Sequence, residues 1–313
     1  MHSPDSPSFA PRAWFGARGE PDSTVLHGAG QDAQTFSEYS SLFAAGGLRP
    51  CLYMAYTGLR GLDAERLGRL GAHLREHADP ACALQLGLSM THDGTPEEHY
   101  EHEVAEGRHD AAIKCLADFL SALGRDVYLR VGYECNGPWN GYEPVSYRAA
   151  FRRVVDRLRP AVPSLATVWC VEGGFVDTAM DYYPGGEAAD WWSVDLFGVD
   201  HFAKAPPFLD AALEHRKPVM IGECTPRRVG VDDGLASWER WYAPFFGLIR
   251  RHPAVKAFCY INWEWSKHPQ WADWGNARVQ DHPEVLRRYR EELRLPLYGH
   301  LEGRRGGKGV AAT

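Results

Sequence analysis

Eight short apolar runs, separated by polar stretches of helical length, constrain the fold of this 313-residue chain more than any other feature. The runs are nearly continuous rather than alternating, as expected for strands that are buried on both faces. Strands that alternate with helices predict parallel βαβ units, and eight such units predict a single-domain (β/α)8 barrel, an α/β fold. The predicted strands cover residues 24–28, 49–56, 81–88, 126–134, 165–170, 191–197, 218–223 and 255–263.

The residues between and outside these runs predict the helices and the division of the chain. A second apolar piece, residues 197–202, runs on from the sixth predicted strand. We assign residues 1–20 to an N-terminal extension, 21–298 to the barrel, and 299–313 to a Gly-rich tail that is expected to be disordered. The predicted helices cover residues 63–77, 103–123, 144–158, 237–251 and 283–293.

Composition narrows the classes of partner. The net charge is −7 and we find no long basic block, which disfavours nucleic acid because phosphate binding needs clustered Lys and Arg. The N-terminus lacks an apolar stretch of signal-peptide length, and no run approaches the roughly 18 apolar residues that span a bilayer. The seven cysteines lack paired CxxC spacing, so neither a disulfide framework nor a structural zinc site is indicated. We therefore expect a cytoplasmic protein that binds no cofactor, metal or membrane. The sequence does not indicate an oligomeric state.

Two glutamates mark the predicted active site. Glu134 and Glu223 end the fourth and seventh predicted strands, and turn-forming residues follow each of them at once. The carboxyl ends of the strands form the edge at which barrel enzymes build their active sites. Strands four and seven lie on opposite sides of the barrel mouth, so we expect both carboxyl groups in one cleft. A separation of about 5–5.5 Å would be that of a retaining glycoside hydrolase.

The surroundings of the two glutamates divide their roles. Glu134 lies near Trp139, and we predict that it is the acid/base that protonates the leaving oxygen. Glu223 is predicted to be the ionised nucleophile, held by donors such as Arg130 or Tyr260. The rival carboxylates are Glu172 and Glu264, which follow strand ends by one or two residues, with Asp195 and Asp200 around strand six.

Aromatic residues are unusually frequent, with 11 Trp, 14 Tyr and 13 Phe. Most are expected to pack in the core, but rings that directly follow strand ends have the amphipathic character that suits the faces of sugars. Three such tryptophans are candidate sugar platforms, although we expect one of them to be core. The predicted substrate-binding residues are Tyr133, Asn136, Trp139, Trp169, His201, Tyr260, Trp263, Trp265, Tyr56, His27 and His92.

Several motifs resemble glycoside hydrolase family 26, a clan A (β/α)8 group best known for β-mannanases. They are Gly-Tyr-Glu-Cys-Asn-Gly-Pro-Trp-Asn at 132–140, Val-Trp at 168–169, Tyr-Tyr-Pro-Gly at 182–185, Ala-Asp-Trp-Trp at 189–192 and Ile-Gly-Glu-Cys at 221–224. The resemblance extends over strands four to eight. It implies that Glu134 is the acid/base and Glu223 the nucleophile of a metal-free, retaining double displacement on a β-linked glycan. The implied substrate is a β-linked oligosaccharide, mannan-like or related.

Two positions depart from the family's pattern. The family commonly has His directly before the acid/base, where this chain has Tyr133. A Tyr that supports the family's nucleophile aligns with Phe197. These departures leave open the alternative of a (β/α)8 protein that binds sugar with altered or lost turnover.

Metal and thiol chemistry are the other classes to weigh. His99, His102 and Glu103 form a cluster, but their spacing lacks the HExxH pairing that puts two ligands on one helical face. We interpret them as a solvated helix start. Cys135 and Cys224 directly follow the two glutamates, and we interpret both as packing residues because a nucleophilic Cys requires a nearby His base.

Overall fold

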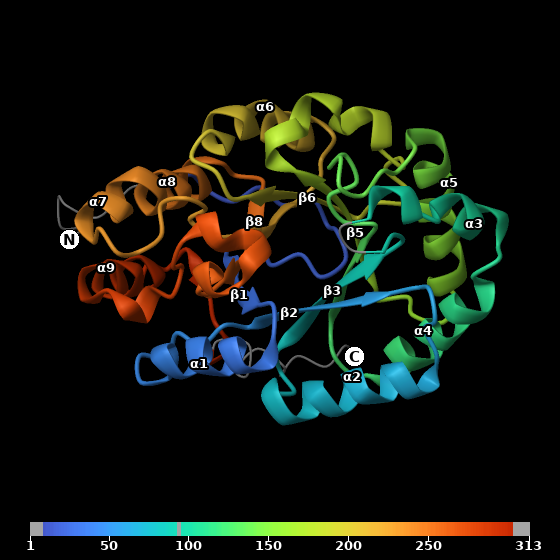
Figure 1. Cartoon of the computed structure of the whole chain (residues 1–313), viewed down its shortest axis with the longest axis horizontal. Coiled ribbons are helices and arrows are strands. Elements are labelled where there is room, and N and C mark those ends of the chain that lie inside the picture. Colours follow the sequence, from blue (N-terminus) through green and yellow to red (C-terminus); the bar gives the residue numbers. More distant parts are fainter. Residues whose placement is uncertain (1–8, 93–94, 303–313) are drawn as a thin grey trace.

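A closed barrel of eight parallel strands with helices outside it forms the body of the protein (Figure 1). The computed structural model describes residues 9–92 and 95–302. The strand order is β2-β3-β4-β5-β6-β7-β8-β1, and β1 pairs with β2 to close the barrel. The single-domain (β/α)8 prediction is therefore confirmed. The strands are β1 (Val25–Gly30), β2 (Leu52–Gly58), β3 (Ala83–Ser89), β4 (Val127–Val131), β5 (Ala166–Glu172), β6 (Trp191–Leu196), β7 (Val219–Cys224) and β8 (Val255–Ile261), with a short β9 (Tyr298–Gly299).

Helices and short helical turns connect the strands. A π-helical turn, η3 (Trp238–Tyr242), joins the helix that ends at Ser237 to the helix that begins at Ala243. The helices are α1 (Ala33–Ala44), α2 (Ala64–His77), α3 (Glu101–Glu106), α4 (Asp110–Ala122), α5 (Pro144–Leu158), α6 (His201–Glu214), α7 (Leu235–Ser237), α8 (Ala243–Arg251) and α9 (Pro283–Leu293). The 3-10 turns are η1 (Pro96–Glu98), η2 (Gly173–Tyr182), η4 (Trp265–Lys267), η5 (Pro269–Trp274) and η6 (Val279–Asp281).

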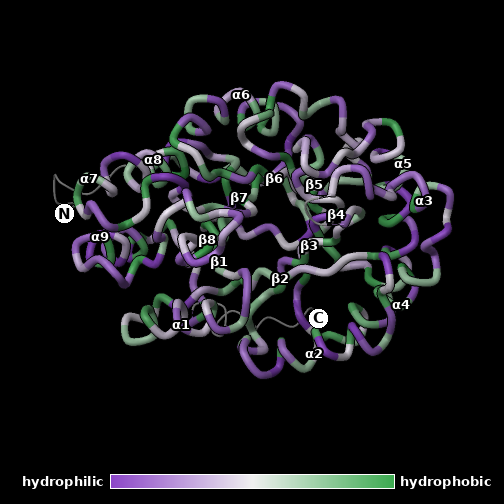
Figure 2. The backbone as a smooth tube through the Cα atoms, viewed as in Figure 1, coloured by the Kyte–Doolittle hydropathy of each residue, from purple (hydrophilic) through white to green (hydrophobic). Residues whose placement is uncertain are grey.

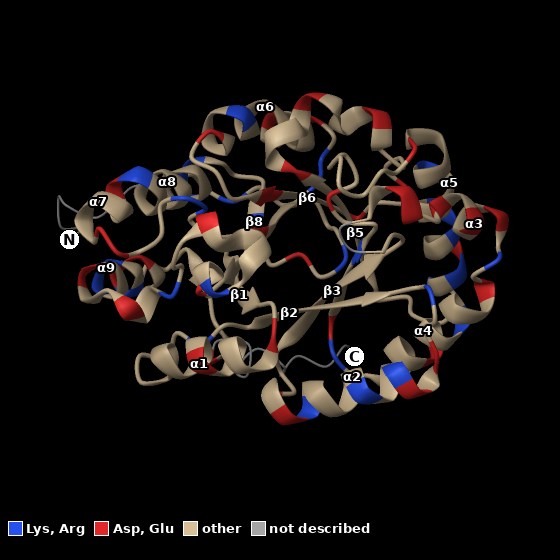
Figure 3. Cartoon of the chain, viewed as in Figure 1, with Lys and Arg blue, Asp and Glu red and all other residues tan. Residues whose placement is uncertain are grey.

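The continuous apolar runs form strands because every face of a barrel strand is covered, by the barrel interior on one side and by helices on the other. Every residue of β1, β3, β4, β5, β6 and β8 is buried. Figure 2 shows apolar residues gathered along the central strands, and Figure 3 shows acidic and basic residues interspersed on the outer helices. Among the residues described, no helix combines the length and the apolar character that crossing a bilayer requires.

The strand ends differ from the prediction at a position that matters for the site. Strand β4 ends at Val131, so Glu134 lies three residues beyond it in a loop rather than at the end of the strand. The prediction was wrong because Gly132 has a left-handed backbone, with φ of +54°, which interrupts the strand. Glu223 lies within β7, one residue before its end.

Three segments were predicted as the wrong element or missed. Residues 197–202 do not extend β6, because a turn leads into α6 at His201 and Pro206 lies inside that helix. The predicted helix over 103–123 is two helices, α3 and α4, since Gly107 ends α3 with φ of +89°. Helix α1 was missed, although Asp32 caps it by accepting a hydrogen bond from the Thr35 amide.

The chain segments outside the predicted barrel close its bottom. The Arg12 guanidinium donates hydrogen bonds to the carbonyls of Ile249, His252 and Val255, so the N-terminal extension is tied to the barrel. At the other end, β9 pairs with β1 and the Leu301 amide donates to the Arg49 carbonyl. Residues 299–302 are thus part of the fold and not of a disordered tail. The rest of the predicted tail, 303–313, lies outside the described residues.

Candidate active site

The carboxyl ends of the strands open into a cavity of about 480 Å³, and both predicted catalytic glutamates line it. Its walls are mostly aromatic, with three charged side chains among them. The lining residues are Gln31, Tyr56, Tyr133, Glu134, Trp139, Asn140, Phe197, Glu223, Arg227, Trp265, Trp271 and Trp274. A sugar-sized hollow that joins aromatic faces with two carboxyl groups is suited to a glycan.

Glu134 is held by its own loop. Its backbone is left-handed, with φ of +50°. Residues with a side chain adopt this conformation at an energetic cost, and such residues are frequent at functional sites. The Trp139 indole Nε1 donates a hydrogen bond of 2.8 Å to Glu134 Oε2. The Asn140 side-chain amide donates to the carbonyls of Tyr133 and Glu134, at 3.1 and 3.0 Å. The loop therefore fixes where the Glu134 carboxyl group points.

The environment of Glu134 favours its protonated form. Burial raises the pKa of Glu134 well above the usual value of 4.5, and the nearby charges of Asp195, Glu223 and Glu172 raise it further. The charge of Arg130 opposes this shift but is the smallest of the named effects. A carboxylic acid that holds its proton at higher pH is what a general acid requires.

Glu223 has the opposite environment. The fully buried Arg130 of β4 donates a hydrogen bond of 2.8 Å from Nη1 to Glu223 Oε1, and its Nη2 pairs with Asp195 of β6. Asp195 Oδ1 in turn accepts the backbone amide of Glu223 at 2.9 Å. A carboxylate that faces a buried guanidinium is stabilised in its charged form. Glu223 is thus held from inside the barrel, by Arg130 at its side chain and by Asp195 at its backbone amide.

A glycine makes this arrangement possible. A Cβ at Gly222 would lie 2.6 Å from Ser193 Oγ, 2.7 Å from Asp195 Oδ1 and 3.0 Å from Arg130 Cζ. Atoms do not approach a Cβ that closely, so the ion-pair network can pack against β7 only where the chain lacks a side chain. This constraint explains the Gly directly before Glu223.

Four of the predicted substrate-binding residues lie on the cavity, namely Tyr56, Tyr133, Trp139 and Trp265. Tyr56 and Tyr133 pack against each other with ring centroids 5.4 Å apart. Burial raises the pKa of the Tyr56 hydroxyl well above its usual value, and the Glu223 charge adds to the shift. Tyr56 therefore stays a neutral hydroxyl, and it donates a hydrogen bond of 3.3 Å to Met54 Sδ.

Four others are fully or almost fully buried behind the cavity. Trp169 is 0 % exposed and packs on Tyr183 and Trp192, so it has no free face for a sugar. The Tyr260 hydroxyl donates to the Ala277 carbonyl, so it is not a donor to Glu223 as predicted. The other two also have hydrogen-bond partners within the protein. His27 Nε2 lies 2.7 Å from the Tyr39 hydroxyl, and Asn136 Nδ2 donates to the Phe175 carbonyl at 2.8 Å.

The remaining three lie beside the cavity or away from it. His201 is buried, and its Nδ1 accepts the Phe197 amide at 3.3 Å; burial lowers the pKa of His201 to about 4, so the ring is neutral. Trp263 donates from Nε1 to Asp32 and stacks on His268. His92 is exposed and does not line the cavity.

The rival carboxylates have other partners. Glu172 accepts the Gly174 amide at 2.6 Å and is buried, and Glu264 pairs with Lys267 at 2.6 Å. Neither of them lines the cavity. Cys135 and Cys224 are fully buried, as predicted for packing residues, and burial raises the pKa of the Cys135 thiol to about 12.

Five cavity residues were missed from the sequence, namely Gln31, Asn140, Arg227, Trp271 and Trp274. Arg227 lies near the rings of Trp274 and Phe197, with its Cζ 5.3 and 6.0 Å from their centroids. Most of these residues lie in loops well beyond a strand end, so the rule of looking at strand ends does not find them. Asn140 was detectable, since it belongs to the same motif as Glu134.

Barrel glycoside hydrolases hold two carboxyl groups of contrasting environment at the carboxyl ends of the strands, and the cavity of this protein resembles that arrangement. No established family model matches the chain. By sequence the chain is 28 % identical to a β-1,3-xylanase from a Vibrio species and to a β-1,3-xylanase from an Alcaligenes species. Each match covers 89 % of this chain, and the chain spans 66 % and 65 % of those two proteins.

Solved structures share the fold. A family 26 protein from Muricauda sp. (GH26C) superposes with a TM-score of 0.66 at 13 % identity, over 89 % of this chain and 88 % of that one. The catalytic domain of a family 26 endo-β-1,4-mannanase from Bacillus sp. JAMB-750 superposes with a TM-score of 0.64 at 16 % identity, with the same coverage of both chains. The resemblance to family 26 that the motifs indicated is confirmed at the level of fold, and the relatives by sequence are glycoside hydrolases.

Proposed function

We propose that this protein is a retaining glycoside hydrolase that cleaves β-linked oligosaccharides by double displacement. The observation that carries the proposal is the contrast between two glutamates in one cavity. Glu134 has a raised pKa and faces the indole of Trp139, whereas Glu223 is paired with the buried Arg130. Glu134 protonates the leaving oxygen while Glu223 attacks the anomeric carbon, and Glu134 then removes a proton from the water that releases the sugar.

The substrate class follows from the cavity and the relatives together. The aromatic walls suit the faces of pyranose rings, and Tyr56 and Gln31 supply polar groups for ring hydroxyls. The sequence relatives are named for β-1,3-xylan and the structural neighbours for β-1,4-mannan. Because the sequence similarity is the higher of the two, β-1,3-linked xylo-oligosaccharides are the first substrates to test, followed by β-1,4-linked manno-oligosaccharides.

A mechanism-based label provides the sharpest test. A 2-fluoro glycosyl fluoride of the preferred sugar should form a stable ester on Glu223, which peptide mass spectrometry locates. Glu223→Ala should not be labelled, and both Glu134→Ala and Glu223→Ala should lose kcat by several orders of magnitude on natural oligosaccharides. Glu264→Ala is the matched control, since this carboxylate follows β8 but lies off the cavity, and it should keep full activity.

One outcome would favour a different function. A parent protein that binds oligosaccharides, with equal affinity in Glu223→Ala, but turns over none of them would be a sugar-binding barrel. The feature that makes this alternative specific is Phe197, which lines the cavity without the hydroxyl that family 26 commonly has there. A Phe197→Tyr variant that gains turnover would show which group is lacking.

A further inference from the structure

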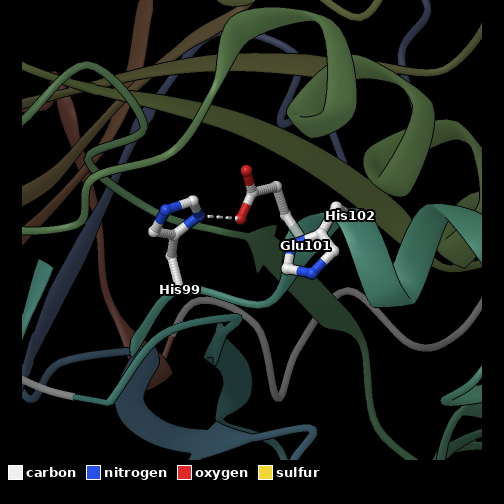
Figure 4. Close-up of side chains that lie close together, drawn as sticks. All are labelled: His99, Glu101 and His102. Carbon is white, nitrogen blue, oxygen red and sulfur yellow. Dashed lines mark hydrogen bonds and ion pairs between the residues drawn. The ribbon is translucent and has the colours of Figure 1, made fainter. Parts of the chain in front are cut away.

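Two histidine side chains and a glutamate side chain lie close together at the start of helix α3. His99 follows the η1 turn, and Glu101 and His102 begin helix α3, as Figure 4 shows. One nitrogen or oxygen atom from each of the three side chains lies within 4.8 Å of the other two. The ring centroids of His99 and His102 are 6.2 Å apart.

The carboxylate of this cluster is unusual because it is fully buried. Glu101 is 0 % exposed, and its Oε1 accepts hydrogen bonds from the Glu143 amide at 3.0 Å and from the Ser146 hydroxyl at 2.9 Å. Its Oε2 lies 2.7 Å from His99 Nδ1. A buried carboxylate requires a compensating charge or a metal ion. Among the ion pairs of residues 9–92 and 95–302, its partner is His99, which is charged only when protonated.

We propose that His99, Glu101 and His102 bind one divalent transition-metal ion of the zinc type. Two imidazole nitrogens and a carboxylate oxygen are the donor set that zinc prefers, with bonds of about 2.0–2.2 Å. Such bonds place two ligand atoms of a tetrahedral ion about 3.3 Å apart. The contact between His99 Nδ1 and Glu101 Oε2 therefore has to open by about half an ångström to admit the ion. His102 is exposed, so the fourth position faces solvent and takes a water molecule.

The sequence grouped Glu103 with the two histidines and indicated a solvated helix start, whereas the structure places Glu101 beside them. Glu103, the acidic residue that was grouped with the two histidines, turns to His109, whose Nε2 lies 3.1 Å from its Oε2. Glu101 takes the place of Glu103 because it lies on the inner side of α3, where Ser146 and the Glu143 amide of helix α5 hold its other oxygen. These two donors orient the ligand as outer partners do in known metal sites.

The position of the cluster indicates what the ion does. Glu143 precedes α5, and the loop from β4 to α5 carries Glu134 and Trp139. On the same side, Gly141 approaches so closely that a Cβ there would lie 2.3 Å from the Pro96 carbonyl oxygen. An ion held by the β3–α3 segment thus braces the loop that orients the proposed acid/base. This site is separate from the proposed reaction, and its test uses no substrate.

Binding has a defined proton balance. The ion takes the Nδ1 lone pair of His99, so the hydrogen shared with Glu101 leaves that nitrogen. A neutral His99 then carries its hydrogen on Nε2, and a protonated His99 releases one proton to solvent.

Calorimetric titration of the metal-free full chain with zinc chloride tests the proposal. We expect one ion per chain, an affinity that drops at least tenfold in His102→Ala, and a drop of about 10–100-fold in Ser146→Ala through the orientation of Glu101. His102 is exposed, so its removal should leave the circular dichroism and melting temperature of the metal-free protein unchanged. Zinc should raise the melting temperature of the parent by more than that of His102→Ala.

A second histidine pair serves as the matched control. His73 and His77 lie one turn apart on α2 with ring centroids 4.9 Å apart, and Glu76 Oε2 lies 3.6 Å from His77 Nε2. Among the described residues, these three do not form a group whose ligand atoms all lie within 4.8 Å of one another. His77→Ala should bind zinc as the parent does. The proposal is overturned if the parent binds no zinc, if His102→Ala binds as tightly as the parent, or if His77→Ala is the variant that loses the ion.

Discussion

Replacing Arg130 with Met should show that Glu223, the proposed nucleophile, is held by a buried charge network and not by packing. Arg130 is 0 % exposed, and it pairs with Asp195, also 0 % exposed, and with Glu223, whose side chain is 12 % exposed. Removing the guanidinium leaves two carboxylates in the barrel interior without their cation. Breaking a buried ion pair in this way costs about 3–5 kcal/mol. We expect the free energy of unfolding to fall by that amount.

Urea denaturation followed by tryptophan fluorescence measures the loss, and a matched triple variant separates charge from shape. Arg130→Met combined with Asp195→Asn and Glu223→Gln has similar side-chain volumes but no stranded charges, so it should recover most of the stability. The deficit of the single variant should also shrink as the pH is lowered, because burial raises the pKa of Asp195 well above its usual value and a protonated carboxyl group needs no cation. A single-variant loss under about 1 kcal/mol, or a triple variant as unstable as the single one, would refute the reasoning.

Three further predictions concern the acid/base loop. Because burial raises the pKa of Glu134, kcat/KM should fall as the pH rises through that pKa, and Glu134→Gln assayed on an aryl glycoside with a good leaving group should lack this basic limb. Trp139→Phe removes a donor that favours the carboxylate, so the basic limb of the pH profile should move up by about half to one unit, since such a bond contributes about 0.5–1.5 kcal/mol; an unmoved limb would contradict the assignment. Gly141→Ala should lose more than about 1 kcal/mol in urea denaturation, because its φ is +67° and a Cβ would meet the Pro96 carbonyl, whereas Gly68→Ala on the open face of α2 should gain about 0.5–1 kcal/mol.

The architecture could be predicted because the barrel imposes its pattern on the sequence. Strands covered on both faces favour apolar residues at most positions, so β3, β5 and β8 appear as nearly continuous apolar runs with one or two buried polar residues in each. Helices α5 and α9 were placed to the residue, since each begins with a Pro at its first turn.

Where prediction failed, the cause was a local backbone feature that hydrophobic pattern does not record. Gly132 and Gly107 end their elements through left-handed conformations, although the apolar pattern continues past both. Helix α6 escaped notice because Pro206 and Pro207, which normally stop a helix, lie inside it.

The cavity was predictable only as far as its residues belong to strand ends or motifs. Glu134, Glu223 and Trp139 were found in this way. Trp271 and Trp274 come from the η5 turn after β8, whose path depends on tertiary packing, and Trp265 packs against both of them. Trp169 was misread for the opposite reason, because a ring at the end of an apolar run points outward to the helices as readily as into the mouth of the barrel.

The two glutamates are the same residue at the same edge of the barrel, and what differs is the part of the protein that holds each one. Glu223 is fixed from inside the barrel, by Arg130 and Asp195 on two other strands. A group that must attack one atom gains from such rigidity. Glu134 is oriented by its loop, through Trp139 and Asn140, and its pKa is raised by burial and by the charges of Asp195 and Glu223. The position of the proposed nucleophile is therefore set by the barrel, whereas the orientation of the proposed proton donor is set by a loop outside the strands.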